Sequence, residues 1–426
     1  MADRRRSSLQ DRKPGIDLFD DPAWATHRDL GRTPLGWLRH GAFVLFLVIL
    51  GLLGLVGVIV LVSLVVAVVG GFHLNLGPIN ITPPPPSSYG IDIALSADGS
   101  VVYVTEPADN RLVVVNATTG QVLSTVAVGT DPSGLAVSPD GSQVWVVDTT
   151  LSSGTIVSGS GSVSVVSTAT DQVLGTIPVG SGPIDVAFSP DGRSAYVTNN
   201  GALTPGSVSV IDTATLKVVG TLTPTASSSV GSAGSNPTSV AVTPDGEEVW
   251  VSQVDDLDDL SGSSTTPDAV SVFDAATGAL MATIPVGSGP FFMALSHDGR
   301  EAYVADKMSC DLREINTATF SVVATVDWPS SHGCPYGLAT GPDDNVVYTV
   351  TGSDHTLSEG HAGNAFGSAD FATGQAHVSG HVGQDPVTVA LSLDATTAYV
   401  VDADRPVIDL VDPTDGSIKA AFTIPD

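Results

Sequence analysis

Five residues in the last quarter of the chain have side chains that commonly bind metal ions. They are His332, His355, Glu359, His361 and His381. Imidazole nitrogens and carboxylate oxygens bind zinc and similar ions. Their spacing matches no established metal motif, so solvated loop side chains remain the alternative. We therefore assign none of them as a metal ligand.

An acidic run offers a second kind of ligand chemistry. Asp255, Asp256, Asp258 and Asp259 could supply oxygen ligands for calcium, but they lack the alternating spacing and the glycine of an EF-hand loop. The sequence also contains no G-x-S-x-G elbow, Walker loop, C-x-x-C-H haem attachment or H-E-x-x-H motif. We assign no catalytic and no cofactor-binding residue. An enzyme whose residues converge from separate repeats stays open.

Cys310 and Cys334 are the two cysteines of the chain. We predict a disulfide between them, because both fall in loops of a domain expected outside the cell. Two free thiols are the alternative. A catalytic cysteine is disfavoured, because no assigned histidine and acid accompany either residue.

These residues are positioned by an internal repeat that runs through residues 90–426. Each copy has a short apolar strand, a Ser-Pro-Asp-Gly-like turn and a strand centred on an aromatic residue. The turns begin at Ser96, Ser138, Ser189, Thr243, Ser296, Gly341 and Ser392, and the aromatic residues are Tyr103, Trp145, Tyr196, Trp250, Tyr303, Tyr348 and Tyr399. In all seven copies the aromatic residue follows the Asp of the turn by five positions.

Most copies continue with a third and a fourth strand, such as residues 207–212 and 173–179. Four strands in each of seven repeats predict an all-β fold, a seven-bladed β-propeller preceded by a single N-terminal transmembrane helix. A closed ring buries both faces of every blade, and we expect the aromatic residues to fill the spaces between blades. The seventh repeat supplies four strands itself, so a strand borrowed from residues 78–90 is not required.

The strand after the third turn reads Tyr196-Val197-Thr198-Asn199, and Tyr103-Val104-Thr105-Glu106 is a near copy. On these residues and the Ser-Pro-Asp-Gly turns, residues 90–426 resemble the YVTN-type, lactonase-like seven-bladed β-propeller proteins. Later copies depart from the pattern, with Asp344 and Ala395 where glycine is usual. The resemblance implies the fold. It leaves the activity open, because such propellers include lactone hydrolases, haem-bearing domains and binding proteins.

An apolar segment precedes the repeats. Residues 42–69 contain neither a charged residue nor proline. This segment is long enough for a membrane-spanning helix. A cleaved signal peptide is the alternative, but the leader is too long and no A-x-A site follows. Arg28, Arg32 and Arg39 precede the segment, and the next basic residue is Arg111. The positive-inside rule therefore predicts a single-pass cell-membrane protein with a cytoplasmic N-terminus and an extracellular propeller.

These observations give four predicted regions. Residues 1–40 form a disordered cytoplasmic tail, residues 41–70 the transmembrane helix, residues 71–89 a Pro-rich linker and residues 90–426 the propeller. The net charge is −29, and the chain beyond residue 40 contains eight basic and 39 acidic residues. Such a surface repels phosphates, so nucleic acid is not an expected partner, whereas the lipid bilayer is one.

Function is expected on one edge of the ring. In a four-stranded blade, the loops between the second and third strands share an edge with the loops that join consecutive blades. We call this edge the upper face, and the edge with the Asp-Gly turns the lower face. The long segments 149–161, 254–269 and 352–365 belong to the upper face.

We hypothesise that the upper-face loops make the propeller a binding or protein-interaction scaffold for an unidentified protein or small molecule. The alternative is an extracytoplasmic lactonase-like hydrolase or lyase, with or without a metal. A purely structural envelope protein is a third interpretation. The sequence leaves any cofactor unknown.

Overall fold

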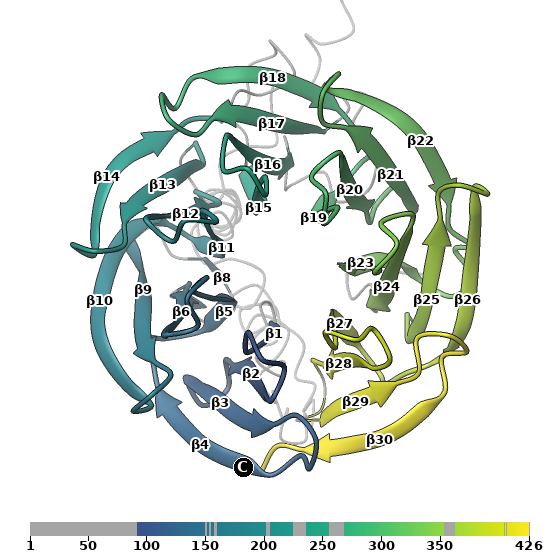
Figure 1. Ribbon diagram of the computed structural model, residues 1–426, viewed down its shortest axis with the longest axis horizontal. Helices are drawn as coiled ribbons and strands as arrows, with labels where there is room; N and C mark the ends of the chain where they lie inside the picture. Colours follow the sequence, from purple (N-terminus) through teal and green to yellow (C-terminus); the bar gives the residue numbers. More distant parts are fainter. Residues whose placement is uncertain are drawn as a thin grey trace, which may run out of the picture. The chain divides into compact units, whose positions relative to one another are not determined.

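The computed structural model describes residues 92–149, 151–152, 155–156, 160–201, 205–224, 236–254, 268–352, 363–403, 405 and 407–425. These residues form seven antiparallel sheets of four strands, arranged as the blades of a ring (Figure 1). The first strand of each blade lies innermost and the fourth lies at the rim. The predicted all-β, seven-bladed propeller is thereby confirmed.

The chain divides into two units, residues 1–82 and 83–426, and every described residue belongs to the second. The predicted cytoplasmic tail (1–40), transmembrane helix (41–70) and Pro-rich linker (71–89) lie outside the described residues. Within the described ranges, no helix is long and apolar enough to cross a membrane.

Each blade comes from one stretch of the chain. Blade one holds β1 (Ile93–Leu95), β2 (Val101–Glu106), β3 (Arg111–Asn116) and β4 (Val122–Ala127). Blade two holds β5 (Pro132–Val137), β6 (Gln143–Asp148), β9 (Ser160–Ser167) and β10 (Gln172–Ser181), with the two-stranded ribbon β7 (Leu151–Ser152) and β8 (Thr155–Ile156) between β6 and β9. Blade three holds β11 (Pro183–Phe188), β12 (Ser194–Asn199), β13 (Ser207–Asp212) and β14 (Lys217–Leu222).

The remaining four blades repeat this order. Blade four holds β15 (Asn236–Val242), β16 (Glu248–Val254), β17 (Ala269–Asp274) and β18 (Leu280–Pro285). Blade five holds β19 (Pro290–Leu295), β20 (Glu301–Asp306), β21 (Asp311–Asn316) and β22 (Ser321–Asp327). Blade six holds β23 (Cys334–Thr340), β24 (Val346–Gly352), β25 (Ala365–Asp370) and β26 (Gln375–His381). Blade seven holds β27 (Pro386–Leu391), β28 (Ala398–Asp402), β29 (Val407–Val411) and β30 (Ile418–Thr423).

The hydrophobic core is divided into seven layers, one at each junction between neighbouring blades. At the junction of blades two and three, Trp145 packs with Val163 of its own blade and with Val186 and Val197 of the next. The repeated aromatic residue of each blade faces the following blade in the same way, as predicted. The two faces of one sheet therefore belong to two different layers, and the strands are rich in β-branched residues because both faces are buried.

The junction between blades seven and one closes the ring by the same means. Tyr399 of β28 packs with Val102 and Val113 of blade one, and its hydroxyl donates to the Ala117 carbonyl at 3.2 Å. Blade seven contains four strands from its own repeat, as predicted. Among the described strands, side-chain packing closes the ring without a shared sheet.

Two aspartates at equivalent positions tie the innermost strands of different blades together. Asp92 accepts hydrogen bonds from the Leu135 N–H in blade two at 3.0 Å and from the Thr388 hydroxyl in blade seven at 3.2 Å. Asp185 of blade three likewise accepts from the Val240 N–H in blade four at 2.9 Å. Burial, together with repulsion from Asp185, raises the pKa of Asp92 to about 7 despite these hydrogen bonds.

The Ser-Pro-Asp-Gly turns form a second ring of contacts on the lower face. In blade two, Asp140 accepts from the Ser138 hydroxyl at 2.7 Å and from the Ser142 N–H at 3.0 Å. Five of the seven turns have a glycine with a positive φ that faces the turn of the preceding blade. A Cβ on Gly299, whose φ is 72°, would lie 2.8 Å from Cδ of Pro244. Glycine is therefore favoured at this position because it tolerates a positive φ and because a Cβ would collide with the proline of the preceding blade.

The departure at Asp344 has a physical explanation. In the preceding blade, His297 occupies the position that proline takes in most of the turns. Its N–H donates to Asp344 Oδ1 at 2.8 Å, and its Nδ1 lies 2.7 Å from the same oxygen. Proline has no N–H with which to make this bond. The junction of blades five and six thus replaces a proline–glycine contact by a polar pair, and the two departures from the repeat belong together.

We predict that His297→Pro alone lowers the stability of the propeller by about 1–2 kcal/mol, because the partly buried Asp344 loses its donors. Adding Asp344→Gly should recover most of this loss, because it recreates the contact found at the other junctions. Thermal unfolding of the single and double variants measures the coupling. Purely additive effects would contradict the pairing.

A second prediction concerns Asp92, whose pKa is raised to about 7 from 3.8. The folded state binds this proton more tightly than the unfolded state does. The resulting stability is greatest below pH 4 and is lost as the pH rises to 7, by up to about 1.4 kcal/mol per pH unit for one proton. The stability of Asp92→Asn relative to the wild type should therefore be higher at pH 8 than at pH 5, as measured by the free energy of unfolding at each pH. Asp98→Asn, at an exposed turn, is the control, and parallel profiles of Asp92→Asn and the wild type would refute the assignment.

Candidate functional site

Several predicted metal-ligand candidates lie outside the described residues. They are His355, Glu359, His361, Asp255, Asp256, Asp258 and Asp259. The two candidates that are described lie on opposite sides of blade six. His332 precedes the innermost strand, with its Nδ1 2.9 Å from the Ser331 hydroxyl, and His381 ends the outermost strand, with its Nδ1 2.8 Å from Asn364 Oδ1. In the described part of the chain, no group of three or more His, Cys, Asp or Glu residues is arranged to hold a metal ion.

The predicted disulfide is confirmed. Cys310 and Cys334 are bonded, with their Cα atoms 4.8 Å apart. Cys310 lies between β20 and β21, and Cys334 begins β23, so the bond joins blades five and six at the upper face. It fixes two neighbouring loops relative to each other.

A polar residue three positions after each aromatic ends the second strand at the upper face. The seven are Glu106, Asp148, Asn199, Gln253, Asp306, Thr351 and Asp402. Asp148 accepts from the Gly129 N–H at 2.9 Å and from the hydroxyls of Ser162 and Ser164 at 2.9 and 2.8 Å. It thus holds the linking loop from blade one against the strands of blade two. Burial raises the pKa of Asp148 to about 6, against the opposing effect of these donors.

Blade five has a charged version of this arrangement. Arg313 Nε lies 3.1 Å from Asp306 Oδ2 and 3.0 Å from Asp311 Oδ1. Burial and repulsion from Asp311 raise the pKa of Asp306 well above its usual value, although Arg313 opposes the shift. Among the described residues, Asp306 Oδ1 is buried without a hydrogen-bond partner. The side chain of Asp306 has no exposed surface, so a bound substrate cannot reach it.

An aromatic group beside this cluster is the better candidate for a binding surface. Phe291 and Phe292 lie on the innermost strand of blade five, and Tyr336 lies on that of blade six. The ring of Tyr336 is 5.0 Å from Phe292 and 5.7 Å from Phe291. Lys307 Nζ lies 4.5 Å from the centre of the Tyr336 ring. All three rings are only partly buried, so they present apolar surface beside a cation.

The repeat motifs do not indicate this aromatic group, although one position of the inner strands carries a signal. Six positions before the Asp of each turn, the inner strands carry Asp92, Gly134, Asp185, Ser239, Phe292, Gly337 and Thr388. The only aromatic residue at this otherwise small or polar position is Phe292.

Comparison with known proteins is consistent with the fold. Residues 86–296 match the family described as the cytochrome D1 heme domain. The chain is 32% identical over 110 residues to the seven-bladed beta-propeller protein Rv1057 of Mycobacterium tuberculosis, and the match covers 26% of each chain. Hydrazine synthase of Kuenenia stuttgartiensis has a TM-score of 0.62 at 20% identity, over 81% of this chain and 100% of that chain. At that identity the likeness shows the fold alone.

The matched stretch does not fit a haem site. Residues 86–296 contain no histidine or cysteine, although haem iron is commonly held by His, Cys, Met or Tyr. Met281 lies on the rim strand β18, and Met293, Tyr103 and Tyr196 are buried in the layers between blades, while Tyr89 lies outside the described residues. The chain is a seven-bladed β-propeller, and the stretch that matches the cytochrome D1 heme domain contains no histidine or cysteine that could bind haem iron.

Proposed function

We propose that this chain is a membrane-anchored, extracytoplasmic binding protein whose propeller takes a protein or small-molecule ligand on its upper face, at blades five and six. The observation that carries this proposal is the partly buried group of Phe291, Phe292, Tyr336 and Lys307. Aromatic side chains with a neighbouring cation supply large contact area at little entropic cost, and they dominate many binding surfaces.

The surroundings of this group favour a preorganised surface. Phe291 and Tyr336 lie on inner strands of adjacent blades, and the Cys310–Cys334 bond joins the same two blades nearby. A surface built on strands and held by a disulfide loses little conformational freedom when a ligand binds. The YVTN-type resemblance is compatible with such a role, because the family shares the scaffold and varies the loops.

The proposed location has two supports. Residues 41–70 are apolar, and basic residues precede them. The disulfide adds an independent argument, because such bonds persist in oxidising compartments and are rare in the cytosol. The acidic composition beyond residue 40 supports a partner other than nucleic acid.

A hydrolase would need an accessible acid and base. Among the described residues, Asp306 and Asp311 come nearest to that chemistry, since one carboxyl has a raised pKa beside a second carboxylate. Their place under the linking loop supports a structural role, because the Gly287 N–H donates to Asp306 at 2.9 Å and the side chain is fully buried. Binding without turnover is therefore the better-supported function.

We predict that a thermal-shift screen of the full chain finds a stabilising compound or protein that it does not convert. Tyr336→Leu should lower the affinity for that ligand by about tenfold, because it removes the ring that contacts Phe292 and Lys307. Val219→Ser, on the exposed rim strand β14, is the matched surface control. Hydrolysis of a lactone by the wild type, or a ligand indifferent to Tyr336→Leu, would contradict the proposal.

The location gives a separate prediction. In intact cells that produce the full chain, external protease should digest the propeller, and the protein should stay with the membrane after alkaline extraction. Cys310 and Cys334 should react with a maleimide only after reduction, because they are bonded. A propeller protected from protease, together with thiols that react without reductant, would place the domain in the cytoplasm instead.

A further inference from the structure

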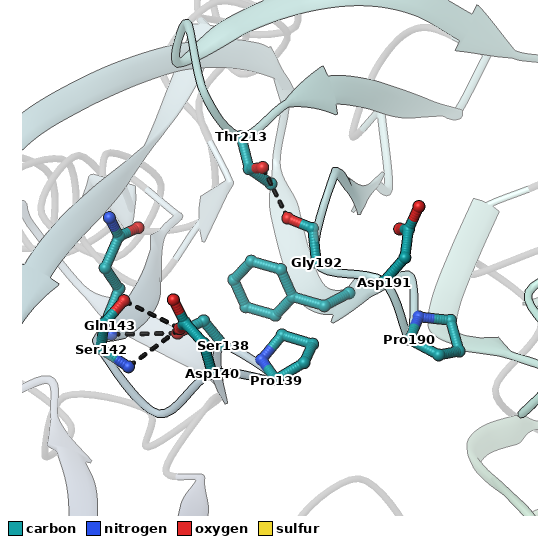
Figure 2. A pocket seen from close by; sticks show the side chains of 10 residues that line it. Ser138, Pro139, Asp140, Ser142, Gln143, Pro190, Asp191, Gly192 and Thr213 are labelled. Carbon is teal, nitrogen blue, oxygen red and sulfur yellow. Dashed lines mark hydrogen bonds between the residues drawn. The ribbon is translucent and has the colours of Figure 1, made fainter.

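The lower face contains a groove between blades two and three that the proposed upper-face function does not use. It has a volume of about 380 Å³ and lies between two Ser-Pro-Asp-Gly turns (Figure 2). Residues 138–140, 142 and 143 line one side, residues 188 and 190–192 line the other, and Thr213 lies at one end. The volume is within the range of small-molecule sites.

A small side chain leaves space beside the turns at this junction. Ser142 lines the groove two positions after the Asp of its turn. The equivalent residues in blades three, four and five, Arg193, Glu247 and Arg300, are longer, whereas those in blades one, six and seven, Ser100, Asn345 and Thr396, are also short. The proline of blade two still contacts Gly192 of blade three, with Pro139 Cδ 3.7 Å from where a Cβ would lie. The turns therefore touch as they do elsewhere, and the short Ser142 leaves space beside them.

The groove combines apolar walls with a carboxylate at its edge. Phe188, Pro139 and Pro190 supply the apolar surface, and the Phe188 ring is held edge-on against Trp145 at 5.1 Å. Asp140 Oδ1 accepts from Ser138 and Ser142, which lowers the pKa of Asp140 and keeps it ionised near neutral pH. Its bonds with the turn also hold the carboxylate in place.

Two further polar groups lie at the groove. Asp191 is a weaker anchor than Asp140, because Arg193 Nε already lies 3.8 Å from its Oδ2. Gln143 lies on the same side of the groove as Asp140, opposite Asp191, and its Oε1 accepts a hydrogen bond from the Trp145 Nε1–H at 2.9 Å. That bond fixes the amide and couples the groove to the buried Trp145 ring.

We propose that this groove binds an organic cation, an ammonium or guanidinium group on an apolar stem. The stem would lie against Phe188 and the two prolines, and the cationic head would bind the carboxylate of Asp140. A small amine and a basic side chain of a partner segment share this chemistry. The acidic composition of the chain beyond residue 40 attracts either of them.

Benzylammonium is a suitable probe, with benzyl alcohol and benzoate as neutral and anionic analogues of similar shape. Titration of the full chain should change the Trp145 emission saturably in the millimolar range, because Trp145 contacts both Phe188 and Gln143. Ligand-observed NMR of benzylammonium gives a second readout that does not depend on fluorescence. An arginine-containing tripeptide, set against its citrulline analogue, separates a side-chain ligand from a small amine.

Two variants test the assignment without disturbing the turn. Asp140→Asn retains an oxygen for the hydrogen bonds from Ser138 and Ser142 but removes the charge. It should lower the affinity for benzylammonium by about five- to tenfold. Ser142→Arg should abolish binding, because the longer arginine side chain would fill the space that Ser142 leaves in the groove. Asp245→Asn makes the same change in the turn of blade four and is the matched control, which should bind as the wild type does.

The outcomes separate clearly. Binding of benzylammonium that is lost in Ser142→Arg, weakened in Asp140→Asn and retained in Asp245→Asn supports the site. The proposal fails if benzyl alcohol binds as tightly as benzylammonium, if Ser142→Arg binds unchanged, or if neither readout detects binding. Because the groove and the aromatic group are on opposite faces, Tyr336→Leu should leave benzylammonium binding unchanged.

Discussion

Burial between blades, and not within them, is the constraint on which the rest of the structure depends. A four-stranded sheet with two apolar faces cannot shield either face alone, and stacking in a closed ring shields both. The seven layers meet that requirement, and each contains the repeated aromatic residue of one blade. Because Tyr399 completes the seventh layer against blade one, no layer is left open to water among the described residues.

That division of the core leaves the two edges of the ring to polar interactions, and the edges use different chemistry. On the lower face, each turn is held by bonds within four or five residues, such as those of Asp140 with Ser138 and Ser142. On the upper face, a single side chain such as Asp148 holds a linking loop and the neighbouring strand together. The lower edge is uniform because its bonds are local, whereas the upper edge varies from blade to blade.

The same distinction explains how much could be predicted from the sequence. The spacing of five between Asp and aromatic residue reports a local turn and strand, so the blade number and the aromatic core followed directly from it. Gly129 donates to Asp148, and Gly287 donates to Asp306, across the same separation of 19 residues. Each of these bonds joins a linking loop to the next blade, so no single repeat indicates it. The Phe291–Tyr336 contact joins two blades, so neither repeat taken alone indicates it.

Positions that depart from the repeat give individual blades contacts and surfaces that the other blades lack. His297 and Asp344 replace a proline and a glycine in adjacent turns, and together they make a bond that neither could make alone. Phe292 replaces small or polar residues on the inner strands and places an aromatic ring beside Tyr336. Ser142 stands where blades three to five have longer side chains, and it lines a groove. In each case the layers between blades keep the backbone in place while one position changes its chemistry, so a ring of near-identical units can carry distinct sites on its two faces.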